Sequence, residues 1–127
     1  MTGGRYLIDS HILIWLDSGN QRLKPAVLQM LQFASQRYLS AATAWELGMK
    51  QATGKLRLRV PVGSMLQVFG LLELPVTVRH GEKAAQLPLL HRDPFDRMLV
   101  AQAMVEGLIL VTADSLMAQY GVPVVLV

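Results

Sequence analysis

The sequence predicts an α/β fold in which a parallel sheet lies between two layers of helices. Short apolar runs alternate along the chain with segments whose apolar residues recur at helical spacing. The run 108–111 is apolar at every position, which is typical of a parallel strand covered on both faces. The length of 127 residues and the hydrophobic content of 52% predict one domain, residues 1–127, with a substantial core.

The expected strands are short and the expected helices lie between them. The apolar runs that we expect to be strands are residues 6–8, 37–39, 74–78, 108–111 and 122–127. The expected helices are residues 10–16, 25–36, 41–53, 61–72, 80–87 and 94–106, with one further helical turn at 115–119. Residues 17–20 form a turn cluster, and residues 55–60 alternate basic and apolar side chains as an extended segment with a basic edge.

The helix over residues 94–106 carries the first candidate functional residue. Asp93 is a good N-cap, Pro94 suits the first helical position, and Gly107 suits the end. Asp96 then lies in the first turn, at the top of an apolar stripe, where a carboxylate is costly without a partner. The alternative is that Asp93 and Asp96 only cap the helix and favour its dipole.

Three further acidic residues lie near the ends of other apolar segments. Asp9 ends the first expected strand, Asp114 follows the fourth, and Glu46 lies early in the helix after the second. Because ligands of open α/β sheets bind beyond the carboxyl ends of the strands, these three and Asp96 can converge at one edge.

Four carboxylates within a few ångströms of one another repel unless a cation neutralises them or their pKa values rise. Oxygen ligands favour Mg²⁺ or Mn²⁺ over zinc, and such ions activate water for hydrolysis of a phosphodiester. Ser10 and Thr112 stand beside candidate ligands and are expected to support the site by hydrogen bonds, unless they only make local turn bonds. Taken singly, the acids also have structural explanations, because Asp9 and Asp114 can be N-caps and Glu46 can pair with Lys50.

The chain resembles the PIN-domain ribonucleases, and in particular the VapC-type toxins of bacterial toxin–antitoxin pairs. The matching segments run in the family's order from one end of the chain to the other: residues 7–11, 40–47, 54–56, 87–88, 91–103 and 112–114. The longest of these, which contains Asp93-Pro94-Phe95-Asp96-Arg97, is the most specific. Ser10 stands where the family often has Thr, and the segment 115–120 is less typical.

The resemblance implies a PIN-like fold with a five-stranded parallel sheet and an Mg²⁺- or Mn²⁺-dependent endoribonuclease activity. It implies that Asp9, Glu46, Asp96 and Asp114 are the catalytic metal ligands, and it leaves Asp93 as a cap. The implied partners are an RNA substrate, a second copy of the chain, and a VapB-type antitoxin whose apolar segment fills a groove and whose basic side chain enters the acidic site. The candidate RNA-contacting residues are Lys50, Lys55 and Arg97.

Two other function classes are weaker. An aspartyl-phosphate phosphatase with Asp9 as nucleophile lacks the second Asp two residues on, where His11 stands, and a receiver domain lacks the acidic pair. A catalytically silent PIN-fold interaction module is not favoured, because all four acids are intact. The histidines His11, His80 and His91 show no ligand spacing, which argues against zinc.

The remaining expectations concern partners and location. The net charge of +3 favours polyanionic partners only weakly. The helix containing residues 65–72 has almost no polar face, so Phe69 is a candidate for the antitoxin groove, with a well-covered core helix as the alternative. The absence of cysteine, of a signal-peptide pattern at residues 1–5 and of a membrane-spanning run predicts a cytoplasmic protein without a membrane partner.

Overall fold

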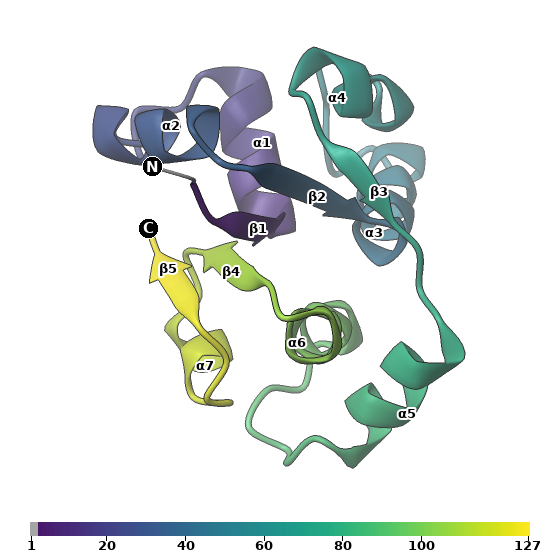
Figure 1. The fold of residues 1–127 in the computed structure, drawn as a ribbon. Coiled ribbons are helices and arrows are strands. Elements are labelled where there is room, and N and C mark those ends of the chain that lie inside the picture. The colour runs from purple at the N-terminus through teal and green to yellow at the C-terminus, as the bar shows by residue number, and fades with distance from the viewer. Residues whose placement is uncertain (1–2) are drawn as a thin grey trace.

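The structure is a parallel sheet between two helix layers, as the sequence predicts. The computed structural model describes residues 3–127. Met1 and Thr2, which belong to the segment 1–5 that is expected not to be a signal peptide, lie outside the described residues. Within this range the strands are β1 (Arg5–Ile8), β2 (Gln36–Ser40), β3 (Leu72–Leu74), β4 (Ile109–Thr112) and β5 (Val124–Leu126). These five strands form one sheet in the order β3-β2-β1-β4-β5, and each neighbouring pair is parallel (Figure 1).

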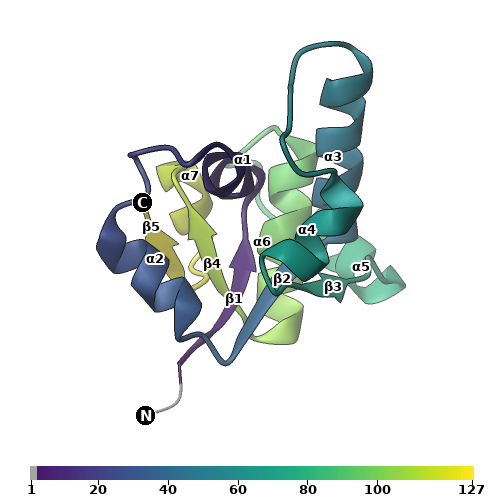
Figure 2. The ribbon, with the colours of Figure 1, turned by 90° about the horizontal axis from the view of Figure 1, so that it is seen from above.

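The helices cover both faces of this sheet. They are α1 (Ser10–Ser18), α2 (Pro25–Gln32), α3 (Ala41–Ala52), α4 (Val62–Val68), α5 (Val78–Gln86), α6 (Pro94–Glu106) and α7 (Ser115–Ala118). Helices α1 to α4 lie on one side of the sheet and α5 to α7 lie on the other (Figures 1 and 2). No helix in residues 3–127 combines the length and the hydropathy needed to cross a bilayer.

Alternate residues of the central strands supply two separate cores. Tyr6 and Ile8 of β1 face the core under α1 to α4, whereas Leu7 faces the core under α6 and α7. On β4, Val111 and Leu110 divide in the same way, and both are fully buried. Both faces of the central strands are therefore covered, which explains the continuous apolar run in this part of the sequence.

The strand order places the reversal of the chain between β1 and β4. From β1 the chain adds β2 and β3 on one side, and it then returns to add β4 and β5 on the other. Ile8 pairs with Val111, so the residues that follow these two strands emerge side by side. Such a switch point is where open α/β sheets bind ligands, because neighbouring loops diverge there.

The boundaries of α2, α4 and β3 differ most clearly from the expected ones. Helix α2 ends at Gln32 rather than near residue 36, because Ser35 N–H donates to the carbonyl of Gly4 and starts the approach to the sheet. Helix α4 ends at Val68, and Gly70 has a left-handed φ of 64° that turns the chain. Strand β3 accordingly starts at residue 72 and stops at 74, before Pro75, which has no N–H for a ladder bond.

Asp17 belongs to the last turn of α1 rather than to the expected turn cluster. Its carboxylate is buried and accepts hydrogen bonds from the backbone N–H groups of Arg59 and Val60, both at 2.8 Å. These bonds anchor the segment 55–60, which is irregular rather than paired in the sheet. Its basic residues 55, 57 and 59 are exposed, as the alternation predicts.

Candidate metal centre

Asp9 is the most buried of the candidate acids and is held in a defined orientation. It directly follows β1, and its backbone N–H donates to Val111 O at 3.0 Å, which extends the pairing of β1 with β4. Its Oδ1 accepts a hydrogen bond from Ser10 N at 2.7 Å and its Oδ2 accepts one from Thr112 Oγ1 at 2.8 Å. Burial raises the pKa of Asp9, although the bonds from Thr112 and Ser10 oppose the rise.

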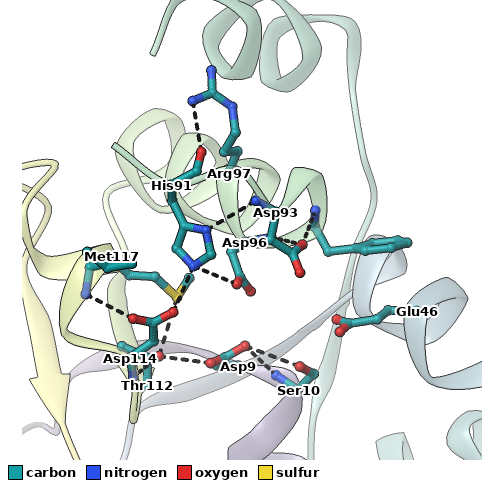
Figure 3. A network of polar contacts seen from close by, with 12 residues as sticks. Asp9, Ser10, Glu46, His91, Asp93, Asp96, Arg97, Thr112, Asp114 and Met117 are labelled. Atoms are coloured by element: carbon teal, nitrogen blue, oxygen red, sulfur yellow. Dashed lines mark hydrogen bonds and ion pairs between the residues drawn. The ribbon is translucent and has the colours of Figure 1, made fainter. Parts of the chain in front are cut away.

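Asp96 lies in the first turn of α6, and its own side chain does not cap the helix. Asp93 is the N-cap, as predicted, because its Oδ1 accepts hydrogen bonds from the N–H groups of Phe95 and Asp96 at 2.8 and 3.2 Å. The Asp96 carboxylate is thereby left to point away from the helix axis (Figure 3). Burial raises the pKa of Asp96 to about 7, and the charges of nearby carboxylates add to the rise.

Glu46 lies on α3 and has one satisfied and one unsatisfied carboxylate oxygen. Its Oε2 accepts a hydrogen bond from Lys50 Nζ at 2.9 Å, which confirms the expected i,i+4 pair. Its Oε1 is buried and has no hydrogen-bond partner within residues 3–127. A buried oxygen without a partner destabilises the fold, so a water or a cation bound at this atom would be stabilising.

Asp114 follows β4 and caps α7. Its Oδ1 accepts a hydrogen bond from Leu116 N at 2.9 Å, and its own N–H donates to Thr112 Oγ1 at 3.0 Å. Thr112 therefore contacts both Asp9 and Asp114, which supports its expected role beside the site. The Ser10 hydroxyl lies 3.4 Å from Asp9 Oδ1, a local contact that agrees with the structural alternative for this residue.

The four acids come from four separate elements and lie around one space. The charges of Asp9 and Glu46 both raise the pKa of Asp96, so the three carboxylates are near neighbours. Asp114 and Asp96 both contact the same ring nitrogen, Nε2 of His91 (Figure 3). Within the described residues, the structure brings Asp96 and Asp114 together with His91 and places Asp9 and Glu46 near Asp96, while the role of each acid as a ligand stays a prediction.

His91 is the site residue that sequence reasoning missed. Its Nε2 lies 2.7 Å from Asp114 Oδ2 and 3.0 Å from Asp96 Oδ2, and the three residues offer ligand atoms within 4.8 Å of one another. The histidines show no ligand spacing in the sequence, and His91 joins this group only through the fold. Its position in the longest family-like segment was the available signal, but no helical spacing joins it to either acid. In contrast, His80 is buried beside Glu106, far along α6 from Asp96.

The candidate RNA-contacting residues have different environments. Lys55 is exposed, and Lys50 is engaged with Glu46. Arg97 is half-buried and donates to three backbone carbonyls of the segment before α6, those of Ala84, Leu87 and Pro88, at 2.9 to 3.0 Å. These bonds hold that segment in place, and RNA contact by Arg97 stays a prediction.

The donor set fits a hard divalent cation. Carboxylate oxygens are the ligands that Mg²⁺ and Mn²⁺ prefer. The unpartnered Oε1 of Glu46 and the pKa of Asp96, raised by burial and by the neighbouring carboxylates, are both consistent with a site that accepts a cation. A divalent cation among them would supply the missing partner and lower the repulsion.

Comparison with known proteins identifies the family and the fold of the chain. The profile of the PIN domain family matches residues 6–123 of the chain. The chain is 32% identical over 111 residues to Ribonuclease VapC22 of Mycobacterium tuberculosis, a match that covers 85% of each protein. Two solved structures have similar folds: DNA-bound VapBC of Salmonella typhimurium (TM-score 0.70, 16% identity, 98% of each chain) and VapBC2 of Rickettsia felis bound to promoter DNA (TM-score 0.70, 16% identity, 94% and 95% of the two chains).

Proposed function

The chain belongs to the PIN domain family, and from this premise we propose that it is a metal-dependent endoribonuclease toxin that a cognate antitoxin inhibits. The observation that carries the proposal is the convergence of four carboxylates, one with a buried unpartnered oxygen, at the switch point of the sheet. The related M. tuberculosis protein is named a ribonuclease, which supports RNA as the substrate class. Because RNA is the substrate that we propose for this chain, we place its activity in the cytoplasm.

The proposed ligands of Mg²⁺ or Mn²⁺ are Asp9, Glu46, Asp96 and Asp114. When bound, the metal would activate water and neutralise charge at the phosphodiester that is cleaved. Asp9 is suited to this role because Ser10 and Thr112 already fix both of its oxygens in place. Preorganised ligands need not reorient when the cation binds, so less of the binding free energy is lost.

Two of these acids also set the charge balance of the site. Asp96 has a pKa of about 7 without metal, so it can hold a proton at neutral pH and release it when a cation arrives. Glu46 shares its charge with Lys50 through one oxygen only, which leaves the other oxygen for the cation. The exposed Lys55 is our candidate to contact the RNA backbone.

The partners we propose correspond to two apolar surfaces. Phe69 lines a pocket of about 260 Å³ together with residues of α1 and α2, including Leu16 and Leu28, and we assign this pocket to an apolar segment of the antitoxin. Met65 lies in α4, the helix that Phe69 caps, and it is fully buried, so the alternative of a core residue holds for Met65.

A second groove of about 540 Å³ is lined by Trp45, Phe95 and other apolar residues, and Trp45 is 65% exposed. We assign this groove to a second copy of the chain, which makes the protein a homodimer.

The decisive experiment measures RNA cleavage by the purified chain with Mg²⁺ or Mn²⁺, before and after Asp96→Asn. We expect the wild type to cleave RNA and EDTA to abolish this cleavage. We expect the substitution to reduce cleavage by about 100-fold or more, because a loss of a few kcal/mol of transition-state stabilisation has an effect of this size. Glu82→Gln, an exposed acid on α5 with the same charge change, is the matched control and should cleave normally. Equal activity of Asp96→Asn and wild type would refute the assignment.

A chain that binds antitoxin but never cleaves RNA would instead be a catalytically silent PIN-fold module. The presence of Asp9, Glu46, Asp96 and Asp114 at the site argues against this candidate, because a silent module has no need to keep all four acids. Binding of Mn²⁺ without any RNA cleavage, across varied RNA substrates, would favour it.

A further inference from the structure

We propose that His91 is a positioning residue of the metal centre, and that it joins Asp96 and Asp114 through a single donated hydrogen. The inference rests on the function proposed above, because it concerns the same site. Nε2 lies 2.7 Å from Asp114 Oδ2 and 3.0 Å from Asp96 Oδ2, so one ring atom faces both carboxylates (Figure 3). These acids come from α6 and from the start of α7, and His91 lies on neither helix.

The other ring nitrogen determines where the imidazole hydrogen resides. The backbone N–H of Asp93 lies 3.1 Å from Nδ1 and donates to it. A backbone N–H can only donate, so Nδ1 must be an acceptor without a hydrogen. The ring is therefore the tautomer with its hydrogen on Nε2, and it donates toward the two carboxylates.

The position of the ring is fixed by elements on several sides. The His91 backbone N–H donates to Tyr120 Oη at 2.8 Å, and its carbonyl lies 3.5 Å from Arg97 Nη1. The side chain is only 14% exposed. Asp93, which holds Nδ1, is also the N-cap of α6, so the same turn sets both the helix start and the ring orientation.

This tautomer argues against His91 as a metal ligand. Coordination through Nε2 requires a free electron pair there, and the hydrogen would then have to move to Nδ1, facing the N–H of Asp93. His91 acts instead through the carboxylates: it holds Oδ2 of Asp96 and Oδ2 of Asp114 toward each other before a cation arrives. Outer partners of this kind typically change metal affinity by 10- to 100-fold when they are lost.

Two substitutions separate the two ring nitrogens. In His91→Asn the amide oxygen can still accept the N–H of Asp93, but the side chain is too short to reach the carboxylates. In His91→Gln the longer side chain can bring an amide N–H near the position of Nε2. We expect His91→Asn to weaken Mn²⁺ binding by about 10- to 100-fold and His91→Gln to recover most of the loss, as measured by electron paramagnetic resonance titration. Equal Mn²⁺ affinity of wild type and His91→Asn would overturn the proposal.

Two spectroscopic measurements on the wild type decide the issue even if a variant fails to fold. Nitrogen NMR of His91 in the metal-free protein should show the hydrogen on Nε2, and a hydrogen on Nδ1 would overturn the proposal. Pulsed electron paramagnetic resonance of the Mn²⁺ complex should show no directly bound imidazole nitrogen, and a strong coupling to ¹⁴N would make His91 a ligand. Failure of the wild type to cleave RNA contradicts the proposed function instead, and the tautomer measurement still tests His91.

Discussion

Thr112 Oγ1 donates a hydrogen bond of 2.8 Å to Oδ2 of Asp9, although 103 residues separate the two in the sequence. Thr112 ends β4, and Asp9 follows β1, its neighbour in the sheet. The same hydroxyl accepts the N–H of Asp114 at 3.0 Å. One side chain therefore connects two of the four candidate ligands across the switch point.

Thr112→Val should lower the free energy of unfolding by about 1–3 kcal/mol, the typical cost of leaving a buried polar group without its partner. Asp9 would lose a donor and the N–H of Asp114 would lose an acceptor. Urea unfolding of the metal-free protein measures the change. Thr112→Ser keeps the hydroxyl and should lose much less, so equal losses in the two variants would contradict this account.

Glu46→Gln should raise the melting temperature of the metal-free protein by roughly 3–6 °C, a change that corresponds to about 1 kcal/mol in a domain of this size. The substitution removes a buried negative charge beside Asp9 and Asp96, and the weak pair with Lys50 offsets only part of this gain. The same variant should gain less stability from added Mn²⁺ than the wild type does. Differential scanning calorimetry with and without Mn²⁺ tests both effects, and a lower melting temperature without metal would count against them.

The stability of the metal-free protein should fall as the pH rises from about 4 to about 7. The pKa of Asp96 is about 7 in the folded state against an ordinary value of 3.8, so the folded state binds more protons across this window. The group's contribution is therefore fully present below pH 4 and lost as the pH passes 7. Chemical unfolding at several pH values should show a shallower decline in Asp96→Asn, whereas an identical pH dependence would contradict the assignment.

Leu28→Asp and Phe69→Asp should each weaken antitoxin binding by about tenfold or more, because both residues line the pocket assigned to the antitoxin. Leu28 is 43% exposed, so its substitution disturbs the core less than that of the half-buried Phe69. Isothermal titration calorimetry with the cognate antitoxin measures the affinity. Val78→Asp, on the exposed surface of α5, is the control, and a matching loss there would point to another surface.

Arg97→Lys and Lys55→Gln should change different properties. The first should change the stability of the fold, and the second should change the salt dependence of RNA binding. Arg97→Lys should reduce stability by about 1.5–3 kcal/mol, because lysine cannot donate to all the carbonyls that the guanidinium holds. Lys55→Gln should leave stability unchanged and lower the salt dependence of RNA binding by about one counterion. Unfolding and binding titrations at several salt concentrations distinguish them, and a stability loss in Lys55→Gln alone would reverse the two assignments.

Local chemistry explains why much of this protein could be predicted from its sequence. Asp93 caps α6, Gly107 ends it, and the apolar run at residues 108–111 forms a strand covered on both faces, because each of these depends on residues a few positions apart. The parallel direction of the strands was also predicted, and with it the expectation that Asp9, Glu46, Asp96 and Asp114 lie near one edge of the sheet. Alternating strands and helices leave few ways to arrange the chain.

Only the tertiary structure decided how these residues meet. The contact of His91 with Asp114 spans 23 residues and depends on the path of the segment before α6, which Arg97 holds through backbone carbonyls. The unpartnered oxygen of Glu46 and the two backbone bonds of Asp17 are likewise invisible in any local spacing. Sequence periodicity specifies which face of an element is buried, but the partner of a buried polar atom is specified by packing between elements that the chain joins by loops.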